Sequence, residues 1–233
     1  MDSESPKTLN ESYSPWFLLL VCVFITSLLT SNIIAVKIIS VSNLILPAAI
    51  IIFPISYIVG DVLTEVYGYS RARKVIWLGF LCNTFLVLFI WIASLLPPAP
   101  FWKAQDAYNT ILGYTPRLLF ASFLAYLVGE FTNSFVLSKM KIRTKGRFLW
   151  ARTIGSTLVG QGLDSLLFIS IAFLGSIPSG SLIRMIIIQW LTKCIYEAIA
   201  TPFTYMAVGF LKRKEGIDFF DYETRFNPLL WTQ

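Results

Sequence analysis

The stretch PWFLLLVCVFITSLLTSNIIAV, residues 15–36, decides the fold, because it contains no charged side chain. A helix needs about 20 predominantly apolar residues to cross the hydrocarbon core of a bilayer. This stretch is long enough to do so, and it is too long for the apolar core of a cleaved signal peptide. We therefore expect it to be retained as the first membrane span.

Further apolar stretches of similar length follow the first one. Each can cross a bilayer as a helix, and they cover residues 43–67, 75–96, 118–138, 153–176 and 183–211. Because no long polar segment separates them, the sequence predicts an all-α integral membrane protein of six transmembrane helices in a single domain, residues 1–233. We expect residues 1–14 to form a flexible cytosolic tail and residues 212–233 a cytosolic C-terminal tail. The aromatic-rich connection 97–117 predicts a short interfacial helix.

The composition excludes several classes of function. The chain is 56% hydrophobic and 14% charged, whereas soluble domains are about one-quarter charged. It contains no histidine, so it lacks the commonest general base and metal ligand, and we do not expect hydrolase or metalloenzyme chemistry. Cys22, Cys82 and Cys194 lie in apolar stretches without a CxxC spacing, which indicates inert thiols. We expect no cofactor and no metal.

The distribution of Lys and Arg predicts the orientation, because positively charged loops stay in the cytosol during insertion. Basic residues concentrate in segments 71–74, 139–152 and 212–214, which follow the second, fourth and sixth predicted spans. Both termini should therefore be cytosolic, in a bacterial inner membrane. We interpret the run KMKIRTKGR, residues 139–147, as a determinant of topology and not as a nucleic-acid surface, so no nucleic-acid partner is expected.

Polar side chains recur within four of the predicted spans, each set along one face of its helix. The sets are Tyr57, Asp61, Thr64 and Glu65; Tyr126, Glu130, Asn133 and Ser134; Thr157, Gln161, Asp164, Ser165 and Phe168; and Gln189, Lys193, Tyr196 and Glu197. A charged group at mid-bilayer costs about 2.5–3.5 kcal/mol even on the lenient insertion scale. Since lipid cannot solvate these faces, we expect them to surround a shared polar cavity.

Two interpretations of these polar faces stay open. In the first, the groups only join helices through hydrogen bonds, with Lys193 and Glu197 paired one turn apart on the same helix. In the second, which the excess of acids over Lys193 favours, they form a binding site for a solute that carries N–H donors. Glu65 lies near the cytosolic end of its span and can pair with Arg71 or Arg73 instead.

Prolines within the spans allow two interpretations as well. Pro47, Pro54 and Pro202 each leave a backbone carbonyl without its helical donor. Such positions can be simple kinks, or they can expose backbone to a transported solute.

Five segments of the chain form a distinctive pattern: TSNIIAVK (30–37), FPISYIVGDVLTEVYG (53–68), RARK (71–74), STLVGQGLDSLLF (156–168) and KCIYEAIATP (193–202). These segments resemble the queuosine precursor transporter family, which is of the vitamin-uptake type. The resemblance extends over residues 26–211. It implies a six-helix fold similar to the substrate-binding components of energy-coupling-factor transporters. It also implies uptake of 7-cyano- or 7-aminomethyl-7-deazaguanine, or queuine, for tRNA modification.

The resemblance also implies site residues, and the polar faces select nearly the same ones. These are Asn32, Asp61, Thr64, Glu65, Asp164 and Lys193. A 7-deazaguanine edge offers N–H donors and a carbonyl. Asp164 or Glu130 can accept from the donors, and Gln161, Asn133 or Lys193 can donate to the carbonyl. Phe168, Tyr57, Tyr126 and Tyr196 can stack on the base, although aromatic side chains in membrane helices more often serve packing.

Three alternatives to this function remain. The chain can be a vitamin-binding component that depends on a separate ATPase, since it has no GxxxxGK[ST] motif of its own. Uptake by cells without energy-coupling-factor subunits distinguishes an independent transporter from such a component. It can be an enzyme acting on lipid head groups, although no nucleophile with a paired base is visible. A purely structural subunit has little reason to retain buried acids. The expected partners are a small nucleobase-like solute and membrane lipid, and a homodimer stays open.

Overall fold

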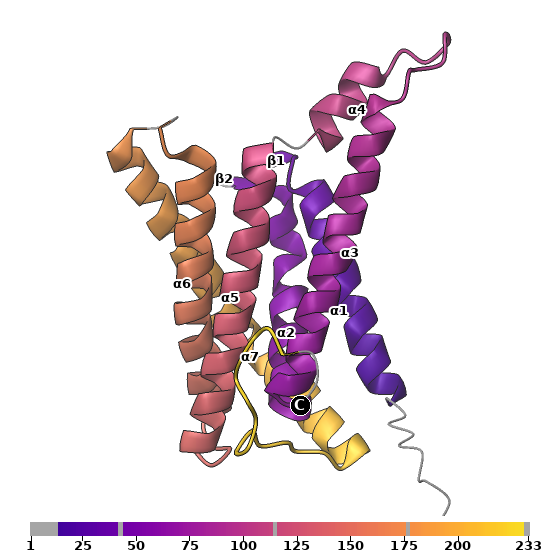
Figure 1. Ribbon diagram of the computed structural model, residues 1–233. Coiled ribbons are helices and arrows are strands. Elements are labelled where there is room, and N and C mark those ends of the chain that lie inside the picture. Colours follow the sequence, from indigo (N-terminus) through magenta and orange to yellow (C-terminus); the bar gives the residue numbers. More distant parts are fainter. Residues whose placement is uncertain (1–13, 42–43, 114–115, 176–177, 231–233) are drawn as a thin grey trace, which may run out of the picture.

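The computed structural model describes residues 14–41, 44–113, 116–175 and 178–230, and it shows a bundle of long helices (Figure 1). In chain order the elements are α1 (Pro15–Ile34), β1 (Ile38–Val41), β2 (Leu44–Pro47), the 3₁₀ helix η1 (Ala48–Ile51), α2 (Phe53–Tyr67), α3 (Tyr69–Leu95), α4 (Gln105–Leu112), α5 (Pro116–Arg143), α6 (Leu149–Phe173) and α7 (Ser179–Glu215). The strands β1 and β2 form an antiparallel hairpin.

The surface and the interior of the bundle have the composition of a membrane protein. In the described part of the chain, five helices are long and apolar enough to cross a bilayer: α1, α3, α5 from residue 119 onward, α6 and α7. Large apolar side chains such as Leu81 and Phe85 are 62% exposed on the outside. Polar side chains such as Thr153 and Ser165 are fully buried. This arrangement suits lipid as the solvent, so the predicted all-α integral membrane protein is confirmed.

The second predicted span differs from the structure. A continuous helix over residues 43–67 was expected, but its first part forms β2 and η1, and α2 begins only at Phe53. Pro54 lies in the first turn of α2, where a missing N–H costs no helical hydrogen bond, so it starts the helix and does not kink it. With 15 residues, α2 is about 22 Å long, shorter than a hydrocarbon core of about 30 Å.

Helix α3 follows α2 almost without a loop. Gly68 makes the turn with φ +83°, a conformation that favours glycine. A Cβ at this position would lie 2.3 Å from Cδ1 of Phe219. The glycine therefore allows both the sharp turn and the close approach of the C-terminal segment.

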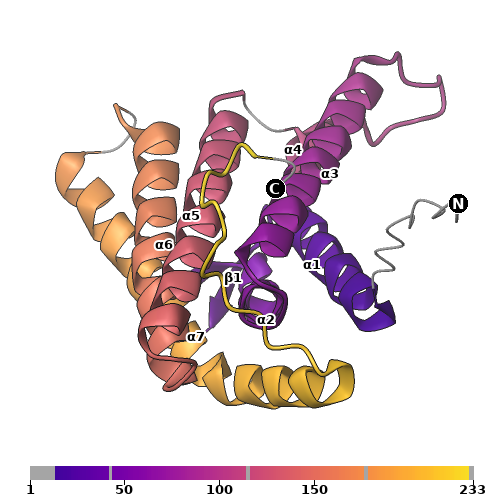
Figure 2. The ribbon, with the colours of Figure 1, turned by 60° about the horizontal axis from the view of Figure 1, so that its bottom comes forward.

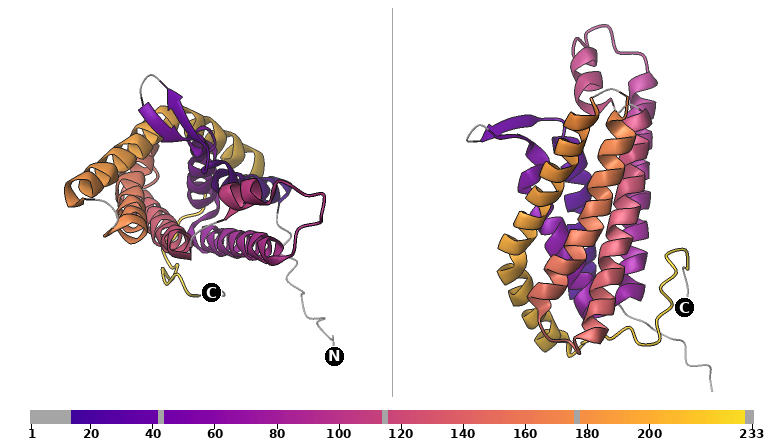
Figure 3. Two further views of the ribbon diagram at one scale, coloured as in Figure 1. Left: turned by 90° about the horizontal axis from the view of Figure 1, so that it is seen from above. Right: turned by 90° about the vertical axis from the view of Figure 1, so that its left-hand side faces the viewer.

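Seen from above, α5, α6 and the first part of α7 lie on one side of the bundle, and α1, α2 and α3 lie on the other (Figure 3). Helices α5 and α6 make the most extensive contact in the bundle, and α7 packs against α6 and α2. The C-terminal half of α7 crosses below α2 toward α1 (Figure 2). There Trp16 and Phe210 are in edge-to-face contact, and the Ser14 hydroxyl donates to Glu215.

Helix α4 confirms the short helix predicted between residues 97 and 117.

Residues 216–230, which we call the C-terminal strap, run across the end of the bundle where α7 ends (Figure 2). The N–H of Phe219 donates to the carbonyl of Val66. Arg73 donates to the carbonyls of Arg225 and Asn227. Helix α7 extends to Glu215, beyond residue 212, where the sequence predicted the tail to begin. The segment after Glu215 packs against the bundle.

Candidate substrate-binding site

A cavity of about 60 Å³ lies among four helices of the bundle. Its lining residues are Phe24, Leu28 and Ser31 of α1, Ser56 and Tyr57 of α2, Tyr126 and Glu130 of α5, and Gln161 and Asp164 of α6. Five of these belong to the site predicted from the sequence. The other four were missed. The three residues from α1 lie on a helix that is almost uniformly apolar and shows no polar face, and Ser56 lies outside the polar face that was chosen for its span.

Two tyrosines are fixed by hydrogen bonds beside this cavity. The Tyr57 hydroxyl donates to Oε1 of Gln161 at 3.2 Å. The Tyr126 hydroxyl donates to the carbonyl of Ile76 on α3 at 3.1 Å. A Cβ added to Gly79 would lie 2.6 Å from that hydroxyl, so the glycine makes room for the Tyr126 ring.

Glycines on α5 and α6 bring the acidic residues of the cavity together. A Cβ at Gly129 would lie 2.8 Å from the Cβ of Asp164. A Cβ at Gly160 would lie 2.7 Å from the Cβ of Asn133. Small residues let membrane helices approach closely, and here they allow Asp164 to lie directly against the helix that carries Glu130.

Lys193 of α7 forms an ion pair with Asp164 of α6. The predicted pairing of Lys193 with Glu197 is therefore wrong. A spacing of four residues permits such a pair, but the packing of α7 on α6 offers Lys193 an acid on the neighbouring helix. The carboxylate oxygens of Glu197 have no hydrogen-bond partner among the described residues.

Asp61 and Asn133 join α2 to α5 one turn away from the cavity. The amide of Asn133 donates to Oδ1 of Asp61 at 2.8 Å. Thr64 and Ser134 meet one turn further on, with 3.1 Å between their hydroxyl oxygens. These contacts match the first interpretation of the polar faces, in which polar groups join helices.

Other predicted site residues lie away from the cavity lining. Asn32 donates to Oδ1 of Asn83 on α3 at 2.7 Å. Phe168 packs edge-to-face against Phe173. Tyr196 and Glu197 are on α7, which contributes none of the lining residues described for the cavity.

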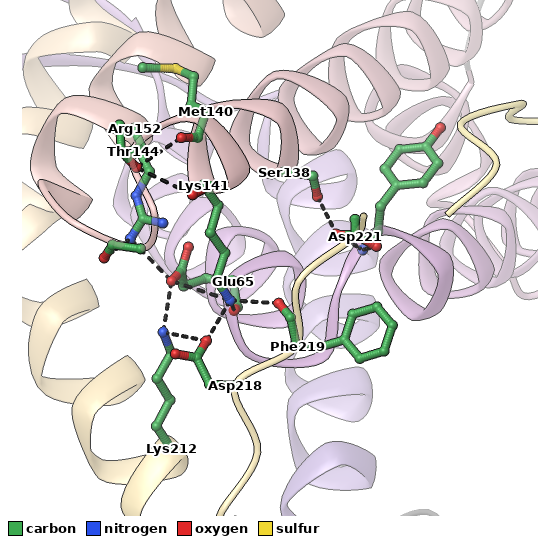
Figure 4. A network of polar contacts seen from close by, with 12 residues as sticks. Glu65, Ser138, Met140, Lys141, Thr144, Arg152, Lys212, Asp218, Phe219 and Asp221 are labelled. Carbon is green, nitrogen blue, oxygen red and sulfur yellow. Dashed lines mark hydrogen bonds and ion pairs between the residues drawn. The ribbon is translucent and has the colours of Figure 1, made fainter. Parts of the chain in front are cut away.

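Glu65 belongs to a separate ionic cluster at the strap end of the bundle (Figure 4). Its Oε1 accepts from Arg152 at 3.1 Å and from Lys212 at 2.8 Å. The Nζ of Lys141 lies 3.6 Å from the same oxygen. The pairing with Arg71 or Arg73 that the sequence suggested is therefore wrong, and Glu65 binds helices α2, α5, α6 and α7 together.

Two strap carboxylates complete this end of the molecule. Asp218 accepts from Lys141 at 2.6 Å and lies 2.8 Å from Nζ of Lys212. Partial burial raises the pKa of Asp218, but the hydrogen bonds from both lysines outweigh it and hold the pKa below its usual value. Asp221 accepts from the N–H of Tyr69 and from the Ser138 hydroxyl (Figure 4). No pattern in the amino-acid sequence indicated these contacts.

The lipid-facing bundle and its internal polar cavity define a multi-pass membrane protein of the transporter class. The chain belongs to the family described as "Putative vitamin uptake transporter", whose model matches residues 47–207. The matched region contains every cavity residue outside α1, together with Lys193.

Two relatives have curated names. The chain is 35% identical over 156 residues to the "Probable queuosine precursor transporter" of Bacillus subtilis (strain 168), covering 66% of this chain and 68% of that protein. It is 27% identical over 121 residues to the "Queuosine precursor transporter" of Escherichia coli (strain K12), covering 52% of each. The family expected from the sequence is thereby confirmed. No solved structure matches the chain.

Proposed function

We propose that the chain carries a queuosine precursor, a 7-deazaguanine base, across the bacterial inner membrane into the cell. The names of the two relatives and the family membership support this substrate class. The observation that carries the proposal is the cavity, where two carboxylates, an amide and two tyrosines come together from three helices.

The chemistry of the cavity suits such a base. The Glu130 and Asp164 carboxylates accept hydrogen bonds from ring and exocyclic N–H groups, and the Gln161 amide donates to the ring carbonyl. Tyr57 and Tyr126 pack on the flat faces of the base. Lys193 holds the Asp164 carboxylate in place through its ion pair.

Entry of the base requires the cavity to widen. Its volume of about 60 Å³ is far below the roughly 300–1,000 Å³ of pockets that enclose small-molecule ligands. The α1 face of the cavity is made of Phe24, Leu28 and Ser31. Outward displacement of α1 is therefore the movement that we assign to substrate entry.

The topology follows from the charges at the two ends of the bundle. We infer six crossings, with α2 and η1 together forming the second one. The basic segments 71–74, 139–152 and 212–214 gather at the strap end, which we assign to the cytosol. Both termini are then cytosolic, and the six-helix arrangement is that expected of energy-coupling-factor substrate-binding components.

A cell-based experiment tests the function. A strain that cannot synthesise queuosine and lacks its own transporter is supplied with this chain and fed 7-cyano-7-deazaguanine, 7-aminomethyl-7-deazaguanine or queuine. Queuosine in tRNA should reappear with at least one precursor. A well-expressed chain that restores none of them would contradict the proposal, and strains without energy-coupling-factor subunits show whether a partner ATPase is needed.

A further inference from the structure

Two fully buried carboxylates of the described helices belong neither to the cavity lining nor to an ion pair. Asp61 of α2 and Glu197 of α7 are each 1% exposed. Within the described residues, Oδ2 of Asp61 and both carboxylate oxygens of Glu197 lack a hydrogen-bond partner. The two groups lie on α2 and α7, which pack against each other, so each disfavours a negative charge on the other.

The charged groups on the surrounding helices do not neutralise this pair. Helix α1 carries no charged side chain between Pro15 and Ile34, and Glu130 of α5 adds a further acid. Lys193 is paired with Asp164. The remaining buried cations have other acceptors: Lys141, Arg152 and Lys212 surround Glu65, and Arg73 donates to the strap. Two buried carboxylates therefore lie on contacting helices without a cation to pair with, which a low-dielectric interior strongly disfavours.

Asn133 provides a second observation at the same place. Its side chain is 7% exposed, its amide lies 2.8 Å from Oδ1 of Asp61, and its carbonyl oxygen has no partner within the described chain. The amide therefore satisfies only Oδ1 of Asp61, and Oδ2 is the carboxylate oxygen that can take a proton.

A proton fits this site better than a metal ion does. In the ranges that the structure describes, no group of three or more His, Cys, Asp or Glu side chains can hold a metal ion. A proton needs one carboxylate oxygen and removes a charge from the pair without further ligands.

The acid pair is linked to the cavity through both of its helices. Tyr57, one turn before Asp61 on α2, donates to Gln161 of the cavity. Lys193, one turn before Glu197 on α7, is paired with Asp164 of the cavity. A shift of Gln161 or Asp164 when the base binds is therefore transmitted to the two helices that carry the acids.

We propose that Asp61 and Glu197 form a proton site that couples transport to the proton gradient. A proton from the outer side bonds to a carboxylate oxygen of the pair, travels with the solute, and leaves to water on the cytosolic side. No other bond forms or breaks. The inference rests on the proposed function, because it requires the chain to transport a 7-deazaguanine base.

Proteoliposomes containing the purified chain test this coupling with labelled 7-cyano-7-deazaguanine. With acid outside, the base should accumulate above its external concentration, by about tenfold per unit of pH difference if one proton accompanies each base. A protonophore should abolish the accumulation, and a sodium gradient should not replace acid. Accumulation driven by sodium, or equilibration that ignores the pH gradient, would overturn the proton site while leaving the proposed function intact. No uptake under any gradient would contradict both.

Substitutions of Asp61 and Glu197 test whether these two acids couple accumulation of the base to the proton gradient. Asp61→Asn and Glu197→Gln mimic the protonated state, so each should still exchange labelled for unlabelled base but lose acid-driven accumulation. Asp106→Asn, an exposed acid on α4, is the matched control and should accumulate normally. If either pair variant accumulates the base as the wild type does, the assignment is wrong.

Thermal unfolding in detergent gives a readout independent of transport. A native state that holds a proton on the pair is stabilised as the pH falls. The Tm of the wild type should therefore rise on acidification by more than the Tm of Asp61→Asn or Glu197→Gln. An equal rise in all three proteins would overturn the site.

Discussion

At the residue scale, the cavity is organised by an ion pair between two helices. Lys193 and Asp164 are 13% and 18% exposed, so neither charge is well solvated if its partner is removed. Their contact fixes one of the two carboxylates that we assign to substrate binding. We therefore expect the pair to contribute both to the stability of the protein and to the specificity of the proposed substrate site.

Single substitutions at this pair should be costly and the double substitution milder. Lys193→Met or Asp164→Leu alone leaves one buried charge unpaired, at about 3–5 kcal/mol, whereas both together remove the imbalance. A thermal-unfolding cycle in detergent should show strong coupling. The control cycle, Lys193→Met with Glu197→Gln, should be additive; additivity in the first cycle and coupling in the second would contradict the observed pairing.

Much of the cavity lining could be predicted from residue spacing, but the ion-pair partners of the charged side chains could not. Tyr57, Glu130 and Gln161 were found because polar side chains on one face of a membrane helix must turn inward. Whether Lys193 meets Glu197 or Asp164 depends on how α7 rotates against α6, and spacing along one helix contains no information on that rotation. The same reason explains why Glu65 was assigned the wrong basic partners.

At the element scale, the C-terminal strap closes the bundle end by capping α3. Asp221 is 2% exposed and accepts from the N–H of Tyr69 and from Ser138. Asp221→Asn removes the charge from these bonds, and hydrogen bonds to charged groups contribute about 1.5–3 kcal/mol. We expect a comparable loss of stability in thermal unfolding, with Glu223→Gln, an exposed strap residue, unchanged. Equal stability of the two variants would show that the cap contributes little.

The strap should also respond to acid. The pKa of Asp218 is held below its usual value by Lys141 and Lys212, so its contribution is complete above about pH 4 and is lost as the pH falls through the lowered pKa. Its side chain is 44% exposed, so solvent screening keeps this contribution small. Limited proteolysis with an acid-stable protease should show faster strap cleavage only at the acid end. In Asp218→Asn the acid-dependent increase should be smaller, and an identical increase would contradict this role.

The start of α2 could not be predicted from the apolar pattern. The stretch LILPAAIIIF, residues 44–53, is apolar throughout, and such a run has the same composition whether it forms a strand, a turn or a helix. The hairpin and η1 are decided by backbone pairing with residues 38–41 and by the proline positions. For helices bounded by polar residues, such as α3 and α6, the predicted ends lie much closer to the observed ends.

At the scale of the whole molecule, the strap end and the α4 end should lie on opposite sides of the membrane. Arg147 and Asp106 are exposed at these two ends. In a background with Cys22, Cys82 and Cys194 replaced, an impermeant thiol reagent applied to intact spheroplasts should label Asp106→Cys and not Arg147→Cys. Labelling of Arg147→Cys from outside would reverse the proposed orientation.

The polar cavity is the part of the molecule that we propose binds the 7-deazaguanine base. Equilibrium binding of labelled 7-cyano-7-deazaguanine to the purified chain tests this proposal most directly, with Glu130→Gln compared against the exposed control Glu223→Gln. Losing a charged acceptor for a buried donor costs about 2–5 kcal/mol, so Glu130→Gln should bind at least about tenfold more weakly, while the control keeps wild-type affinity. Wild-type affinity in a folded Glu130→Gln protein would contradict the assignment of this cavity to the substrate.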